Sequence, residues 1–199
     1  NDAGASYPWS VVRNGWANSK LHLESADQHM HRTVVEGWIT WQTALNLFKM
    51  AGVSADLMKQ AGRKGFKPVD LQLKASVSIN NNIKKSTSRN VIGVLNKGAE
   101  KHENIVYTAH WDHFGIGPVI NGDSIYNGAV DNATGVASLL VLAEAFTKLN
   151  KPTERALVFA AVTGEEQGLL GSEYYVNHPV FDIGTTVADI NLDVMNTFG

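Results

Sequence analysis

Apolar residues in the second half of this chain fall into two kinds of pattern. Short, largely apolar runs rich in β-branched residues predict strands buried on both faces, and they are NVIGVL (90–95), NIVYTAH (104–110), ALVFAAV (156–162) and VADINLDV (187–194). Residues 133–149 instead place apolar side chains on one broad helical face, and residues 168–177 predict a shorter helix. The order strand, helix, strand, helix, strand predicts an α/β fold with a mainly parallel sheet and helices on both faces.

The first half of the chain is less regular. Residues 1–40 show no sustained period and are interpreted as irregular structure or short strands. TWQTALNLFKMAG (40–52) and SADLMKQAG (54–62) predict two short helices, the second with Ser54 as its N-cap. VDLQLKASVSI (69–79) alternates strictly between apolar and polar residues, which predicts a half-buried strand.

Composition narrows the classes of partner and of metal site. The chain has 199 residues, 44% of them apolar and 18% charged, which is typical of one soluble globular domain. A formal net charge of -2 without a basic block argues against nucleic acid as a partner. No apolar run has the roughly 20 residues of a membrane span, and residues 1–10 lack a signal-peptide core. The chain has no cysteine, so any metal must be held by histidine and carboxylates.

Acids and imidazoles follow the predicted buried strands. His110 and Asp112 end one strand, Glu165 and Glu166 follow the next, and a third ends at Asp193, while Asp131 lies at the start of the long helix. The carboxyl ends of parallel strands share one edge of a sheet, where ligands bind. We therefore expect these six residues to meet at that edge.

Several carboxylates at one place repel one another unless a cation is present. Imidazole favours zinc over magnesium, and a pair of metals is a common clamp for hydrolysing amides. Asp112 stands two residues from His110, which suits a carboxylate that orients a metal-bound imidazole. His113, one residue further, is expected to point to the opposite side and to be structural.

Glu165 and Glu166 allow a second interpretation. Thr163 and Glu166 have the spacing of a capping box, in which the glutamate carboxylate turns back to the backbone at the start of a helix. As a catalytic pair, one glutamate would bind a metal and its neighbour would act as a base. The spacing does not say which residue has which role.

Four ordered motifs resemble metallopeptidase family 28 of clan MH, the co-catalytic zinc aminopeptidases and their relatives. They are YTAHWDHFG (107–115), GDSIYNGAVDNATGVASLLVLAEA (122–145), RALVFAAVTGEEQGLLGSEYY (155–175) and INLDVMN (190–196). The resemblance implies the three-layer zinc-exopeptidase fold.

The resemblance also implies roles for the six residues. His110 and Asp193 would hold one zinc ion, Asp131 would bridge two, and Glu166 would hold the second. Glu165 would be the general base and Asp112 the partner of His110. In such relatives the peptide bond after the bridging aspartate is often cis, here Asp131–Asn132.

The family pattern includes a second histidine well downstream of the last aspartate, whereas this sequence stops at Gly199. We therefore expect a C-terminally incomplete catalytic domain over residues 36–199, with partial zinc occupancy and little activity of its own. Residues 1–35 are interpreted as the exit from an inserted protease-associated domain, as some relatives have.

The expected function is removal of an N-terminal residue from a peptide substrate by a two-zinc site. Alternatives within the family are a carboxypeptidase and a glutaminyl cyclase. A rival from another class is a catalytically inactive peptidase fold that serves as a binding module. The family also implies a secreted or periplasmic protein.

A separate group, Asp27, His29 and His31, has the spacing of an extended His-x-His chelate. We interpret it as a solvated loop.

Overall fold

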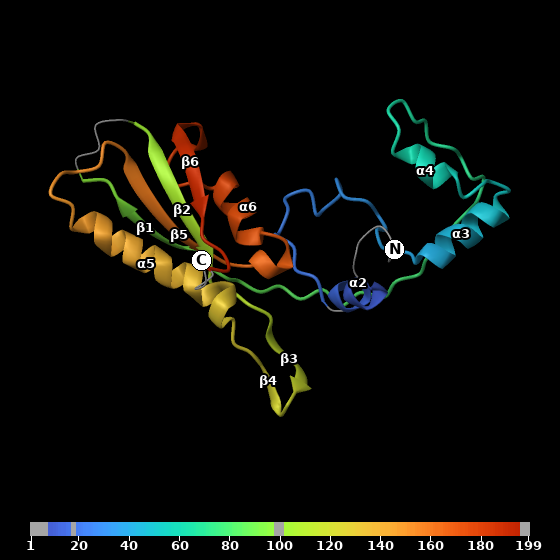
Figure 1. Cartoon of the computed structure of the whole chain (residues 1–199), viewed down its shortest axis with the longest axis horizontal. Coiled ribbons are helices and arrows are strands. Elements are labelled where there is room, and N and C mark those ends of the chain that lie inside the picture. The colour runs from blue at the N-terminus through green and yellow to red at the C-terminus, as the bar shows by residue number, and fades with distance from the viewer. Residues whose placement is uncertain (1–7, 17–18, 98–101, 196–199) are drawn as a thin grey trace. The chain divides into compact units, whose positions relative to one another are not determined.

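The computed structural model describes residues 8–16, 19–97 and 102–195 (Figure 1). The chain forms two compact units, residues 1–20 with 24–84, and residues 21–23 with 85–199. All six expected site residues belong to the second unit. The predicted boundary at residue 35 stays a prediction.

The second unit contains a four-stranded sheet in the order β1-β5-β2-β6. Its strands are β1 (Val91–Leu95), β2 (Asn104–His110), β5 (Ala156–Val162) and β6 (Thr186–Asn191). β2 pairs in parallel with both β5 and β6, and β1 pairs antiparallel with β5. This confirms the predicted mainly parallel sheet. His110 lies opposite Val162, so β2 and β5 end level with each other.

Helices cover both faces of this sheet, as predicted (Figure 1). Successive strand residues point to opposite faces. Val158 and Ala160 of β5 pack in one buried cluster with Tyr175 of α6 (Leu170–Asn177). Leu157 and Phe159 pack in another with α5 (Thr134–Thr147). The result is a three-layer α/β/α arrangement.

Three short helical segments connect these elements. They are η1 (Ala129–Ala133), η2 (Glu165–Gln167) and η3 (Ile183–Thr185). η1 leads into α5 and η2 precedes α6, so both lie where the sequence places candidate site residues. The peptide bond Asp131–Asn132 within η1 is cis, which confirms the expectation.

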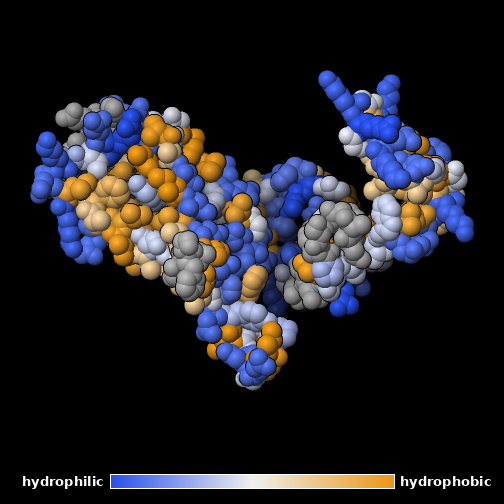
Figure 2. Space-filling view, viewed as in Figure 1, coloured by the Kyte–Doolittle hydropathy of each residue, from blue (hydrophilic) through white to orange (hydrophobic). Residues whose placement is uncertain are grey.

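The sequence interpretation missed a two-stranded hairpin, β3 (Gly115–Ile120) and β4 (Asp123–Tyr126). Its turn is Asn121–Gly122, with positive φ at both residues (53° and 87°). Asn-Gly is a preferred pair in tight hairpin turns because both residues tolerate positive φ. The Asn-Gly dipeptide could therefore have indicated the hairpin from the sequence. The hairpin projects from the unit and shows apolar surface (Figure 2).

The first unit contains α2 (Trp9–Trp16), α3 (Trp41–Met50) and α4 (Leu57–Ala61). α3 and α4 confirm the two predicted helices, whereas α2 corrects the expectation of irregular structure or strands in this stretch. The N-cap of α4 is Asp56 rather than Ser54, whose hydroxyl instead accepts from the Asp56 amide.

The strand predicted at residues 69–79 is wrong: these residues form no strand in the structure. Val69, Val77 and Ile79 are exposed. An alternating pattern identifies a face that could be buried, but a strand also needs a neighbour to bond its backbone. No strand within the described residues pairs with this segment.

Residues 129–147, which include α5, are long and apolar enough to cross a membrane by length and composition. Leu139 and Phe146 of this helix pack on the sheet, as a core helix does. Leu140 and Val141 are exposed, and apolar surface is visible over this part of the unit (Figure 2). We interpret α5 as a core helix. The absence of a membrane span stays a prediction.

Gly171 allows α6 to approach the end of β5 closely. A Cβ at this position would overlap the backbone oxygen of Thr163 and lie 2.5 Å from Asn90 Oδ1. We expect Gly171→Ala to lower the free energy of unfolding by about 1–3 kcal/mol, because backbone would have to move. Urea denaturation measures this. Gly93→Ala is the control, since a Cβ there meets no described atom within 4 Å; equal midpoints for the two variants would contradict the argument.

Candidate metal centre

The expected site residues meet at the carboxyl edge of the sheet. His110 is the last residue of β2, and Glu165 and Glu166 lie in η2, just after β5. Asp193 follows β6 by two residues, and Asp131 lies in η1 before α5. Parallel pairing of β2 with β5 and β6 carries these segments to one edge.

The first cluster is formed by His110, Asp131 and Asp193. His110 is only 3% exposed. Its Nε2 lies 3.0 Å from Asp131 Oδ1 and 3.4 Å from Asp193 Oδ1. Glu165 Oε2 is slightly further from the same nitrogen, at 3.8 Å. One imidazole nitrogen thus faces three carboxylates.

The polar atoms of the first cluster fit a zinc ion. His110 Nε2 and Asp131 Oδ1 are buried, and neither has a hydrogen bond of good geometry within the described part of the chain. Burying such an atom without a partner costs about 1–3 kcal/mol. Zinc bonds of 2.0–2.1 Å at tetrahedral angles hold ligand atoms about 3.3–3.4 Å apart. The spacing of the first cluster is close to this.

The second cluster is formed by His113, Asp131 and Glu166, whose ligand atoms all lie within 4.8 Å of one another. His113 Nδ1 lies 2.7 Å from Glu166 Oε1. Asp131 belongs to both clusters, as a bridging carboxylate would.

The expectation that His113 points to the opposite side is therefore wrong, whereas its expected structural role stays a prediction. It extended strand alternation past the end of β2 at His110, where the chain is no longer a strand. The available signal was a second imidazole three residues after His110, next to the same strand end.

Asp112 contacts His110 of the first cluster and also the turn that contains Glu165 and Glu166. His110 Nδ1 lies 3.0 Å from the backbone oxygen of Asp112 and 3.7 Å from its carboxylate. A proton on Nδ1, donated to that carbonyl, leaves Nε2 free to face the acids. The Asp112 carboxylate itself accepts from the amides of Glu165 and Glu166, at 3.1 and 3.3 Å. Asp112 thus holds the turn that carries both glutamates.

The capping-box interpretation of Thr163 and Glu166 is wrong. η2 begins after Gly164 and has no side-chain cap. The Thr163 hydroxyl pairs with Ser88 at 2.8 Å, and the Glu166 carboxylate pairs with His113. Glu166 therefore points into the site rather than back to its own helix.

Burial and charge in the site together shift two pKa values. Burial alone would lower the pKa of His110, but the Asp112 carbonyl and the surrounding carboxylates raise it above its usual value. Burial raises the pKa of Glu165, opposed by His110 and reinforced by Glu166 and Asp193. Neighbouring carboxylates thus contribute to both shifts, although burial is the main cause of the raised pKa of Glu165. A cation would neutralise that negative charge.

Asn132, which the sequence marked only for its peptide bond with Asp131, ties two of the segments together. This buried side chain donates to the Leu192 carbonyl at 2.9 Å and accepts from the Gly135 amide at 3.0 Å. Its chain neighbour is Asp131, and the neighbour of Leu192 is Asp193. Asn132 therefore holds two acids of the first cluster in place.

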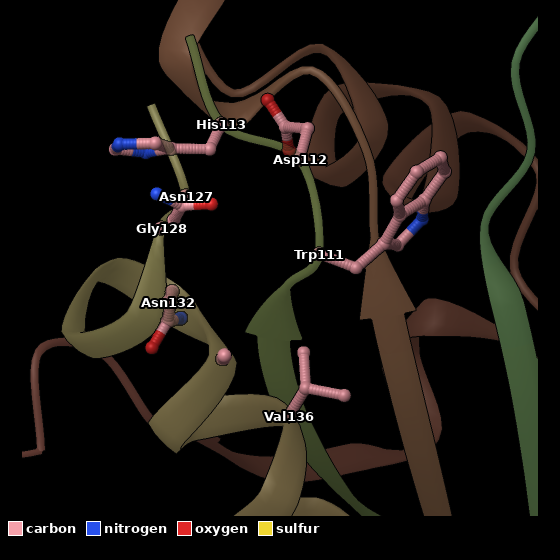
Figure 3. A pocket seen from close by; sticks show the side chains of 8 residues that line it. Trp111, Asp112, His113, Asn127, Gly128, Asn132 and Val136 are labelled. Carbon is pink, nitrogen blue, oxygen red and sulfur yellow. The ribbon is translucent and has the colours of Figure 1, made fainter. Parts of the chain in front are cut away.

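A pocket of about 210 Å³ adjoins the clusters (Figure 3). Some of its lining residues come directly after β2 in the chain, and the others belong to the segment before α5 and to α5 itself. The residues that line it are Trp111, Asp112, His113, Asn127, Gly128, Asn132, Ala133 and Val136. The pocket could admit a small side chain next to the acids.

The Asp27 group does not form a comparable site. Asp27 accepts from His31 Nδ1 at 2.7 Å and from the His29 amide at 3.0 Å. These side chains are exposed, and no metal-binding group of three forms there among the described residues.

The model of peptidase family M28 matches residues 90–199, more than half of the chain. Aminopeptidase YwaD of Bacillus subtilis is 34% identical over 113 residues, which are 56% of this chain and 22% of that protein. Mouse aminopeptidase NAALADL1 is 32% identical over 123 residues, 59% of this chain and 15% of that protein. A "Probable zinc metalloprotease" of Pyrenophora tritici-repentis is 40% identical over 105 residues, 50% of this chain and 22% of that protein.

A solved zinc aminopeptidase from Bacillus subtilis is 34% identical, with a TM-score of 0.43 over 53% of this chain and 24% of the other. The chain thus spans less than a quarter of each of these relatives.

Proposed function

Because the chain belongs to peptidase family M28, we propose that it carries the catalytic centre of a zinc-dependent aminopeptidase acting on peptides. The observation that carries the proposal is the buried His110 nitrogen, which faces Asp131, Asp193 and Glu165 without a good hydrogen bond. Relatives named aminopeptidases and zinc metalloprotease support the same chemistry.

Two zinc ions are proposed for the complete centre. His110 and Asp193 would hold one ion and Glu166 the other, and Asp131 would contribute to both because it lies in both clusters. When bound, zinc supplies a Lewis acid that activates water and polarises the substrate carbonyl. Asp112 and Asn132 keep the donor atoms in position through the contacts described above.

Glu165 is proposed as the general base. Its Oε2 lies 3.8 Å from His110 Nε2, near the first cluster but beyond hydrogen-bonding distance, and its backbone amide donates to Asp112 Oδ1 at 3.1 Å. It would take a proton from the attacking water at one carboxylate oxygen and pass that proton to the leaving amine. A raised pKa favours this role, because it makes the carboxylate a stronger acceptor for the proton of the attacking water.

The inactive binding module, the carboxypeptidase and the glutaminyl cyclase remain outcomes of the same assay. A binding module would bind a peptide without turnover, and a carboxypeptidase would cleave a peptide whose N-terminus is acetylated. A cyclase would release ammonia from an N-terminal glutamine. Secretion or periplasmic location stays a prediction from the family resemblance.

Removal of metal tests the proposal. In the full-length protein, we expect hydrolysis of an aminoacyl p-nitroanilide to fall at least about 100-fold after dialysis against a chelator, because the metal supplies much of the stabilisation of the transition state. One or two equivalents of zinc should restore it. Product release is followed by absorbance, with the N-acetylated substrate as control. Hydrolysis unaffected by chelation would contradict a zinc-dependent mechanism.

A further inference from the structure

The glutamate loop, residues 163–171, carries Glu165 and Glu166 from the end of β5 into the first turn of α6. Three of its residues have positive φ, namely Gly164, Gly168 and Leu169. This conformation is unfavourable for a residue with a side chain, such as Leu169. The loop therefore depends on contacts with the rest of the unit to keep its shape.

Asn90 bonds both ends of the glutamate loop. Its side-chain nitrogen donates to the Gly171 carbonyl at 2.8 Å, and its side-chain oxygen accepts from the Thr163 amide at 3.1 Å. The Gly171 amide also donates to the Thr163 carbonyl, at 2.7 Å. One carboxamide thus joins the first and last residues of the loop, with a donor and an acceptor as a strand backbone would offer.

The register of the sheet explains why Asn90 reaches this place. β1 pairs antiparallel with β5, and the pairing ends where Val91 lies opposite Ala161. Asn90 is the residue immediately before β1. Its side chain therefore continues the hydrogen bonding along β5 at the point where the backbone pairing of the two strands ends.

The glutamate loop is held from both sides of β5, which lies between β1 and β2 in the sheet. On the β2 side, Asp112 accepts from the amides of Glu165 and Glu166. On the β1 side, Asn90 bonds the two ends of the loop. Without Asn90, the contact on the β2 side would remain and the loop could tilt about it.

We propose that Asn90 is a positioning residue for Glu165. Its two hydrogen bonds go to the backbone of Thr163 and Gly171, so it acts on Glu165 through the loop. The inference rests on the proposed function, in which Glu165 is the general base. A displacement of about 1 Å at a reacting group can lower a rate about 100-fold, so a small tilt of the loop is enough to matter.

Asn90→Ala in the full-length protein removes both bonds, and Asn104→Ala is its matched control. Asn104 likewise makes two side-chain hydrogen bonds: it donates to the Thr185 hydroxyl at 3.0 Å and accepts from the Thr186 hydroxyl at 2.9 Å. It begins β2, whereas His110 ends that strand, so it lies at the opposite edge of the sheet from the site.

At saturating zinc, we expect Asn90→Ala to lower kcat for an aminoacyl p-nitroanilide about 100-fold and to change KM less than about threefold, because substrate still binds while the base is displaced. Zinc content, measured by mass spectrometry on the same preparation, should stay at the wild-type value. Asn104→Ala should keep the wild-type kcat even where its unfolding midpoint in urea falls as far.

Two results of these assays would overturn the proposal. Equal losses of kcat in Asn90→Ala and Asn104→Ala would show that Asn90 contributes only stability. A loss of zinc large enough to account for the loss of kcat would show that the effect runs through Glu166 rather than Glu165.

Amide hydrogen exchange of the metal-free protein, followed by NMR, is a readout that needs no activity. The Glu165 amide donates to Asp112 and so reports on the glutamate loop itself. We expect this amide to exchange at least about tenfold faster in Asn90→Ala than in the wild type, and at the wild-type rate in Asn104→Ala. An unchanged rate in Asn90→Ala would overturn the proposal and leave the proposed function intact.

Asn90→Asp carries the same test if Asn90→Ala does not fold. The carboxylate keeps an acceptor for the Thr163 amide but has no donor for the Gly171 carbonyl. We expect kcat to fall at least about tenfold with zinc retained, and a wild-type kcat would overturn the proposal. A wild type whose hydrolysis survives chelation would instead refute the proposed function, and the exchange measurement would still decide whether Asn90 holds the loop.

Discussion

Replacing Glu165 by Gln in the full-length protein is expected to lower kcat by about 10³- to 10⁴-fold while leaving zinc bound. The amide has the shape of the carboxylate but cannot accept the proton of the attacking water, so general base catalysis is lost. The backbone contact from Asp112 does not depend on the Glu165 side chain and should survive. Steady-state hydrolysis and zinc content, measured on the same preparation, test both halves of the prediction.

Glu166→Gln is the matched partner of this variant. The two residues are adjacent in η2, yet only Glu166 belongs to the second cluster, through its contact with His113. Glu166→Gln should therefore lose zinc, whereas Glu165→Gln should lose turnover with metal retained. If both variants lost zinc equally, the division of roles between the two glutamates would be wrong.

Asp131→Asn should lower the zinc content at both positions at once. Its carboxylate is the one donor common to the two clusters, and an amide has neither the charge nor the two equivalent oxygens needed to bridge two cations. We expect less than one equivalent of zinc and turnover near background. His110→Ala, by contrast, should release the first ion while the second cluster keeps its donors.

Asp123→Asn is the control for Asp131→Asn. Asp123 lies in the nearby hairpin, where its side chain accepts from the Ile125 amide, and it belongs to neither cluster. Both variants change net charge equally. Zinc content lowered to the same degree in the two would indicate a general electrostatic effect rather than loss of a bridge.

The central elements could be predicted because their own residues show that they are buried. ALVFAAV is apolar throughout, and β5 is the strand that packs under helices on both faces. The long helix between β4 and β5 was equally clear from its broad apolar face. A parallel sheet then followed from the order of elements, and with it the shared edge where the acids meet.

Elements whose formation depends on a partner were less predictable. Residues 69–79 alternate like a strand, but no described strand pairs with them. The β3–β4 hairpin forms although Ile116 and Val119 remain exposed, so its apolar pattern does not reflect a core. In both cases the deciding factor is the hydrogen-bonding neighbour, which a local pattern does not contain.

By itself, the sequence determined the order of the buried strands and the identity of the acids that follow them, because burial periodicity and residue chemistry are local properties. The tertiary structure decided where side chains point once the strands end. Asp112 turns to the amides of Glu165 and Glu166, and Glu166 turns to His113 rather than to its own helix. The direction of each side chain depends on a partner more than 50 residues away in the chain. Only the packing of the sheet brings the two within hydrogen-bonding distance.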